Sequence, residues 1–185
     1  MDILILGLCI FFVMHLLPSF TSQYAALKNK LGGKIFKVIF VLISFTGLWL
    51  IIFGMGEVEF SPLYEPPSWG KHVTSLLMLI ALYCLISSET KTSIRKITAH
   101  PMLWGISAWA AGHLLANGDK ASVMLFGSFL TYSLFAMYSA NQRGARPTGE
   151  SLALKTDIIV LLAAALVCIG LMFFHDAFTG MPIMG

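Results

Sequence analysis

The chain has 185 residues, of which 57% are hydrophobic and only 11% are charged, and its formal net charge is +3. A soluble domain carries about 25% charged residues, so this composition excludes an ordinary soluble protein and predicts an integral membrane protein. The length accommodates one helical bundle, and we therefore treat residues 1–185 as a single transmembrane domain. The basic residues lie in loops without a nucleic-acid-binding motif, so we expect them to orient the chain in a lipid bilayer and expect no nucleic-acid partner.

Six apolar segments are long enough, or nearly long enough, to cross a bilayer as helices. In chain order they run from Ile3 to Phe20, Ile35 to Met55, His72 to Ser87, Pro101 to Ala116, Ala121 to Ala140 and Asp157 to Phe174. A straight crossing needs about 20 residues, so the third and fourth are short, and the fourth is also the least apolar. The first has no basic N-terminal region and no clear cleavage site, which favours a membrane helix over a cleaved signal. The sequence thus predicts an all-α bundle of six transmembrane helices.

The positions of the basic residues predict how this bundle is oriented. Ten of the twelve follow the first, third and fifth segments: Lys28, Lys30, Lys34, Lys37, Lys91, Arg95, Lys96, Arg143, Arg146 and Lys155. The connections on the other side hold only Lys71 and Lys120. Because loops rich in Lys and Arg stay in the cytoplasm, both termini are predicted on the non-cytoplasmic side of the membrane.

Two connections on the non-cytoplasmic side have a distinct composition. The segment from Gly56 to Gly70 contains three prolines and three aromatic residues, which is typical of a stiff loop at a membrane interface. The sequence Asn117-Gly118-Asp119 predicts a tight turn between the fourth and fifth helices, because Gly permits a positive φ and Asn and Asp cap helix ends.

Histidine is the residue type in these segments with the clearest potential for chemistry. The three cysteines, at positions 9, 84 and 168, lie in separate apolar segments without a C-x-x-C partner, so we expect neither a disulfide nor a zinc site. An imidazole inside a membrane is costly and usually faces the protein interior, where it either bonds to a neighbouring helix or ligates a metal. Neutral imidazoles are common metal ligands and suit haem iron. The five histidines are His15, His72, His100, His113 and His175.

His113 is the strongest candidate ligand among them. It shares a helical face with Met102, Ile106 and Trp109, which fits a macrocycle pocket and equally fits ordinary helix packing. The opposite face carries Gly105, Ala108, Ala111 and Gly112, small residues that let another helix approach closely.

The positions of the other histidines in the sequence do not decide which of them would ligate the same metal as His113. His100 lies thirteen residues away, about 20 Å along a helix, so the two cannot share a metal, and we interpret His100 as either a helix-start residue or a head-group contact. Depth pairs His113 with His72, since both lie in the outer half of the membrane. His15 is deeper, so pairing it with His113 requires a tilted haem or tilted helices. His175 is interpreted as interfacial.

Several separate motifs carry a resemblance to a known family. They are His15-Leu16-Leu17-Pro18, Glu65-Pro66-Pro67-x-Trp69, His100-Pro101-Met102, the stretch from Trp109 to Asp119, and Leu125-Phe126-Gly127. Together they resemble the NnrU membrane proteins, a family associated with bacterial denitrification and nitric oxide metabolism. That family is similar to 15-cis-ζ-carotene isomerase, a membrane enzyme whose haem b iron is ligated by histidines.

The resemblance implies a multi-pass protein of the bacterial inner membrane that binds haem b and performs redox or isomerase-type chemistry. By position it implies His15 and His113 as iron ligands, with a small apolar substrate or a respiratory complex as the partner. The chain lacks the isomerase's long N-terminal targeting region and its His-His pair after the fifth helix, which argues against a carotenoid substrate.

Two alternative functions are weighed against this hypothesis. One is a non-catalytic membrane factor that assists or assembles a respiratory complex such as a nitric oxide reductase, in which the histidines are structural. The other rests on the segment from His100 to Gly105, which resembles the Arg-His-Pro-x-Tyr-x-Gly motif of membrane methyltransferases. Ala99 and Leu103 replace the Arg and the Tyr, and the Glu-containing tail of those enzymes is absent, so this is the weakest of the three hypotheses.

Overall fold

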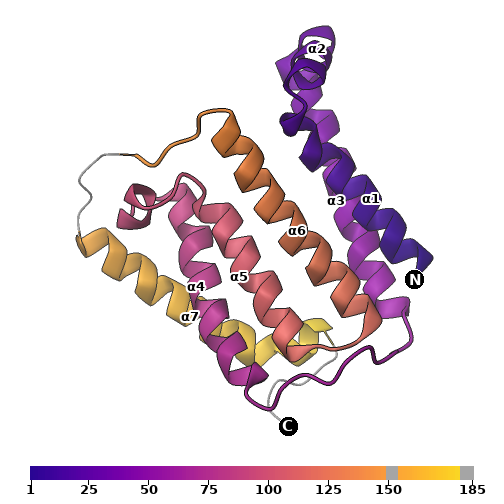
Figure 1. Ribbon diagram of the computed structural model, residues 1–185, viewed down its shortest axis with the longest axis vertical. Coiled ribbons are helices and arrows are strands. Elements are labelled where there is room, and N and C mark those ends of the chain that lie inside the picture. The colour runs from indigo at the N-terminus through magenta and orange to yellow at the C-terminus, as the bar shows by residue number, and fades with distance from the viewer. Residues whose placement is uncertain (149–153, 180–185) are drawn as a thin grey trace.

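The computed structural model describes residues 1–148 and 154–179, and these residues confirm the all-α class (Figure 1). The elements in chain order are α1 (Asp2–Leu16), a 3₁₀ turn (Leu17–Ser19), α2 (Thr21–Leu31), α3 (Gly33–Glu57), α4 (Gly70–Glu89), a second 3₁₀ turn (Ser93–Lys96), α5 (Pro101–Ala116), α6 (Lys120–Gln142) and α7 (Leu154–Thr179). Each of the six predicted apolar segments therefore lies on a helix, with ends displaced by a few residues.

Five of these helices are long and apolar enough to cross a membrane: α1 with its 3₁₀ turn, α3, α4, α6 and α7. The sixth predicted crossing, α5, has only 16 residues. A helix of that length spans about 24 Å, less than the roughly 30 Å of a hydrocarbon core. Large apolar side chains, among them Phe45 and Trp49 on α3 and Leu166 on α7, are exposed on the outside of the bundle, which suits contact with lipid.

The helix α2 was not predicted, because its sequence is polar and does not differ from that of a connecting loop. None of its residues is buried, and Lys28 and Lys30 lie in its last turn. It ends at Gly32, whose φ of 77° lies in the left-handed region that glycine adopts most easily, and the chain then turns into α3. The predicted first helix extends too far at its C-terminal end. The α-helix stops before Pro18, which lies in a 3₁₀ turn.

Small residues set the closest helix contacts. At Gly54 on α3 an added Cβ would lie 2.5 Å from the backbone nitrogen of Leu4 on α1. At Gly112 on α5 it would lie 2.9 Å from the Met78 side chain of α4. The predicted small-residue face of α5 is thus confirmed, and α4 is the helix that packs there. A hydrogen bond from Thr74 Oγ1 to the Gly112 carbonyl, 2.7 Å long, ties the two helices together.

The predicted turn at residues 117–119 is confirmed, but the reason given for its glycine is wrong. The Asp119 side chain caps α6 by accepting a hydrogen bond from the Ser122 backbone nitrogen at 2.9 Å. Gly118 does not have a positive φ. Glycine is required because the backbone carbonyl of Tyr64, in the α3–α4 loop, occupies the place of a Cβ atom.

The α3–α4 loop is therefore fastened to this turn. The backbone nitrogens of Leu63 and Tyr64 donate to the Gly118 carbonyl at 2.7 and 3.0 Å. The Tyr64 hydroxyl donates to the carbonyls of Leu114 and Asn117 at the end of α5. The loop thus ties α3 and α4 to the α5–α6 hairpin.

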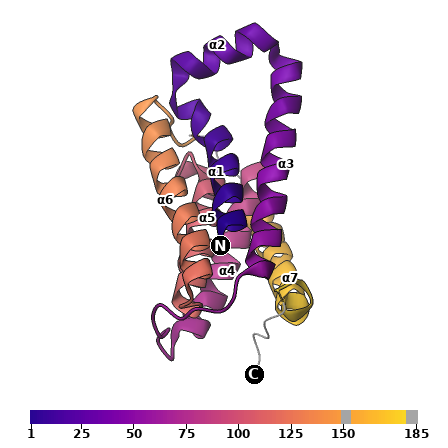
Figure 2. The same cartoon turned by 90° about the vertical axis from the view of Figure 1, so that its right-hand side faces the viewer.

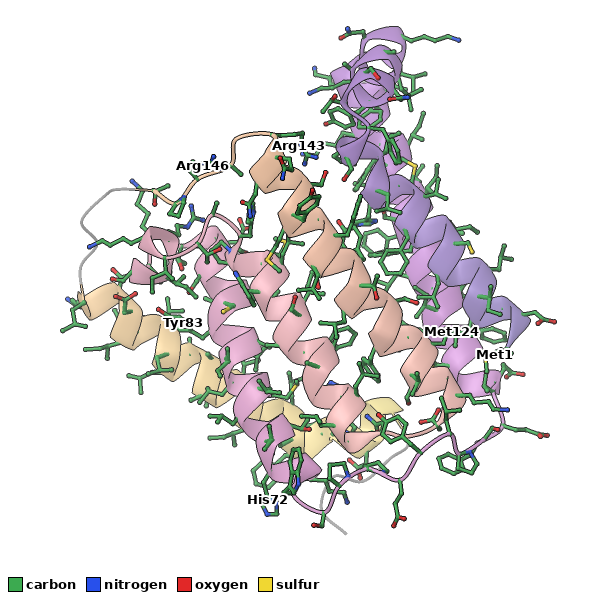
Figure 3. The ribbon with its side chains drawn as sticks, in the orientation of Figure 1. Met1, His72, Tyr83, Met124, Arg143 and Arg146 are labelled. Carbon is green, nitrogen blue, oxygen red and sulfur yellow. The ribbon has the colours of Figure 1, made fainter. Side chains whose placement is uncertain are left out.

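The six long helices run alternately between two ends of the molecule (Figure 1), with α4, α5 and α6 side by side and α7 crossing obliquely behind α4. Turned by 90°, the molecule shows α2 bridging α1 and α3 at one end (Figure 2). Arg143 and Arg146 lie toward that end, whereas His72 lies at the other (Figure 3). We call the end at which α2 lies the basic end. The ten basic residues predicted on one side of the membrane belong to the elements and connections that meet there.

Candidate functional site

Aromatic rings from four helices form one continuous cluster that contains two of the five histidines. Its contacts link α1 and α3 to α5 and α6, and its members, which we call the ring cluster, are Phe11, Phe12, His15, Phe40, Trp109, His113, Phe126, Phe129 and Tyr132. It adjoins the buried apolar core where these helices meet. The ring cluster is the candidate site, since it holds His15, His113 and Trp109 together.

His15 lies in the last turn of α1 and is half-buried. Its ring stacks on Phe11, one turn earlier, with 3.9 Å between the ring centroids. The ring of Phe40 on α3 lies 5.1 Å away, and that of Tyr132 on α6 lies 6.1 Å away. Rings from three helices thus surround this imidazole.

His113 lies in the last turn of α5, and its ring contacts Phe126 on α6, in line with the prediction that it faces the bundle interior. Its ring stacks on Phe126 at 4.4 Å with an interplanar angle of 23°, and Trp109 lies 5.4 Å away. The predicted face of α5 is only partly directed inward, because Met102, at the other end of that face, is 45% exposed.

Both imidazoles are held in the same way by the backbone of their own helix. His15 Nδ1 lies 2.8 Å from the carbonyl oxygen of Phe11, and His113 Nδ1 lies 2.9 Å from that of Trp109. A carbonyl only accepts, so Nδ1 carries the proton in each ring and Nε2 keeps a free electron pair. A backbone carbonyl on the other ring nitrogen is the arrangement that orients metal-ligating histidines. Both rings are therefore in the tautomer that can ligate a metal through Nε2.

The ring contacts of the two imidazoles involve different neighbours. Their neighbours on α6, Tyr132 and Phe126, are six residues apart, which is about 9 Å along that helix. Between them the ring contacts run through Phe11, Phe129 and Trp109. Each imidazole thus lies in its own apolar aromatic surrounding.

The remaining histidines lie outside the ring cluster. His72 is exposed in the first turn of α4, at the end opposite the basic end (Figure 3). His100 precedes α5 at the basic end, where its Nε2 contacts Asn141 Oδ1 at 2.8 Å. His175 on α7 is close enough to His113 for an electrostatic interaction. Across the described ranges, no group of three or more His, Cys, Asp or Glu residues is arranged to hold a metal ion.

An apolar groove of about 650 Å³ lies beside the ring cluster, between α1 and α6. Phe12, Leu16 and Tyr132 form one part of its wall. Gly127 and Ser128 form another part of the wall. A Cβ atom added at Gly127 would have open space around it, with no neighbouring group within 4 Å. This groove offers room for a flat apolar group next to the cluster.

The fold and the site together define a multi-helix protein with membrane-compatible helices and an aromatic histidine centre. A family profile described as NnrU protein matches residues 3–183, so the chain belongs to the NnrU family. No curated protein and no solved structure matches this chain.

The aromatic residues that surround the histidines were not predicted from the sequence. Phe11 could have been found, because it lies four residues before His15 on the same helical face, as Trp109 does before His113. Phe126, Phe129 and Tyr132 lie on α6 without a distinguishing pattern in a segment rich in apolar residues. Their role depends on how α6 is rotated against α1 and α5.

Proposed function

We propose that this protein binds haem b through His113 and serves redox or isomerase-type chemistry connected with denitrification and nitric oxide metabolism. The observation that carries the proposal is the bond from His113 Nδ1 to the Trp109 carbonyl, which leaves Nε2 free to ligate iron inside an aromatic surrounding. Membership of the NnrU family supports the connection with nitric oxide metabolism. The haem would supply the redox centre, and the protein would supply the axial imidazole and an apolar surrounding.

His113 is preferred to His15 as the ligand because the groups around it come from α5 and α6, which are joined by a short fastened turn. His15 is the second candidate, since its Nδ1 is bonded in the same way. A single iron held by both would require the rings of Phe11 and Phe129 to move aside. We therefore expect a single imidazole, that of His113, to hold the iron, whose redox chemistry the haem would supply.

Ligand substitution combined with spectroscopy tests this proposal. The protein is purified from a membrane fraction, and haem is quantified from the reduced pyridine complex for the wild type, His113→Ala, His15→Ala and the exposed control His72→Ala. We expect haem in the wild type and in H72A, its loss in H113A, and its retention in H15A with at most a shifted Soret band. External imidazole should restore the spectrum of a His113→Gly protein, an effect that a purely structural histidine would not produce.

The contrary outcomes are equally clear. Loss of haem in both H113A and H15A would establish a shared iron and contradict the single-ligand assignment. Absence of haem from the wild type, or full retention in H113A, would refute the proposal. The alternative of a non-catalytic factor that assembles a respiratory complex would then be favoured.

We also propose that all six long helices cross the bacterial inner membrane, with both termini outside the cytoplasm. The short α5 would cross inside the layer formed with α4 and α6, which pack against it. The ten basic residues at the basic end support a cytoplasmic location for that end. A reporter fused after Gly185 should be active only in a form that works in the periplasm, and cytoplasmic activity would contradict this topology.

A further inference from the structure

A small polar cleft lies at the basic end, apart from the ring cluster. It has a volume of about 270 Å³ and opens between the end of α4, the second 3₁₀ turn, the start of α5 and the segment that follows α6. Its polar lining consists of Ser88, Arg95, Thr98, His100, Arg146 and Thr148. No part of the proposed haem chemistry uses these residues.

The first turn of α5 forms one wall of this cleft. The helix begins at Pro101 and has no side-chain cap, and proline has no N–H of its own. Met102 and Leu103, which carry the next two backbone N–H groups, line the cleft. Uncapped N–H groups at a helix N-terminus, together with the positive end of the helix dipole, favour an anion.

Two guanidinium groups add positive charge on the walls of the cleft. Arg95 donates through Nε and Nη2 to the carbonyls of Ser87 and Ser88, and Arg146 donates through Nη1 to the carbonyls of Asn141 and Ala145. Each guanidinium has five N–H donors, so further donors remain on both. Within residues 1–148 and 154–179 neither guanidinium forms an ion pair with a carboxylate.

The position of these two arginines is maintained by backbone contacts. Thr148 donates from its backbone nitrogen to the Arg95 carbonyl at 2.9 Å, which joins the segment after α6 to the second 3₁₀ turn. The nearby carboxylate of Asp157 is engaged by Ser93, whose backbone nitrogen lies 2.7 Å away, and does not line the cleft. The cleft is thus a preformed pocket of positive charge.

We propose that this cleft binds a phosphate group, and that its natural source is the headgroup of an anionic phospholipid. Guanidinium groups and the N–H groups of a helix start are the donors that recognise phosphate. The cleft lies at the end of the apolar helices, and Ile97 and Met102 beside it are 81% and 45% exposed, so acyl chains would have an apolar surface to follow. Free inorganic phosphate has the same chemistry and is the other possible source.

Binding to purified protein in detergent tests this proposal. Native mass spectrometry is used to titrate the wild type with dioctanoyl phosphatidic acid, dioctanoyl phosphatidylcholine and inorganic phosphate. The test variant is Arg146→Gln, and the matched control is Arg143→Gln, an exposed arginine in the same turn that donates to Ser139 and does not line the cleft. Thermal unfolding of each variant checks that it is folded.

We expect phosphatidic acid to bind the wild type and R143Q equally, and R146Q about tenfold more weakly, since one charge-assisted contact is lost. Phosphatidylcholine should bind weakly. Binding of inorganic phosphate as tight as that of phosphatidic acid, with the same loss in R146Q, would support the phosphate site and name the soluble anion as its source. Equal binding by R146Q and wild type, an equal loss in R143Q, or no saturable binding of either phosphate probe would overturn the proposal.

Discussion

A single methyl group at position 118 should release the loop that connects α3 and α4. In Gly118→Ala the added Cβ would take the place of the Tyr64 carbonyl oxygen and lie 3.1 Å from the Pro66 ring. One of these groups is backbone and the other is a rigid ring, so neither can move aside as a flexible side chain would. The loop must therefore shift away from the α5–α6 turn.

The shift breaks the two hydrogen bonds that Leu63 and Tyr64 donate to the Gly118 carbonyl. A backbone hydrogen bond contributes about 1 kcal/mol, so the free energy of unfolding should fall by about 2 kcal/mol. For a chain of this size that loss corresponds to a decrease of about 4–8 °C in the unfolding temperature. The amides of Leu63 and Tyr64 should also exchange hydrogen faster than in the wild type.

Thermal unfolding in detergent and hydrogen exchange measure these effects, with Gly127→Ala on α6 as the control. No group lies within 4 Å of a Cβ there, so the substitution should leave stability unchanged or raise it by up to about 1 kcal/mol. A second variant, Gly118→Asn, separates the two explanations for the glycine. Asn tolerates a positive φ but has a Cβ, so it should be as harmful as Ala. Wild-type stability in either position-118 variant would refute the close-approach explanation.

Three further predictions concern contacts that join elements of the fold. Burial, and to a smaller extent the charge of Asp119, raises the pKa of the Tyr64 hydroxyl above its ordinary value. The hydroxyl therefore contributes its full stabilisation below about pH 10. This contribution is lost as the pH rises through the raised pKa. Tyr64→Phe should lower the unfolding temperature at pH 7, and the difference from wild type should shrink at alkaline pH; a constant difference would contradict this. Thr74→Val removes the hydrogen bond to the Gly112 carbonyl and should lower the free energy of unfolding by about 0.6–1 kcal/mol in a denaturation series. A gain in stability would contradict a stabilising role for this bond between α4 and α5. Asp157→Ala removes a charged acceptor of hydrogen bonds from the second 3₁₀ turn. Because solvent screens this carboxylate, the loss should be about 1 kcal/mol by the same measurement, and an unchanged midpoint would argue against that role.

The helices that consist of long apolar segments were predictable from the sequence. Backbone groups in lipid must bond within their own segment, so long apolar segments become helices, and all six were found. The polar α2 has no such requirement, and its sequence does not distinguish it from a loop. The capping role of Asp119 was predictable for a related reason, since a cap depends on residues within one turn of the helix start.

The sequence by itself determined the class of protein, the positions of the apolar helices, the small-residue face of α5 and the inward face of His113. Each of these depends on composition or on spacing within one helix. Only the tertiary structure decided which groups meet across helices. It separated His15 from His113 by aromatic rings, left His72 exposed, and brought Arg95 and Arg146 to one cleft. It also placed a carbonyl of a distant loop against Gly118. Such contacts depend on the rotation, tilt and depth of each helix, which are set by packing against its neighbours and not by the local sequence.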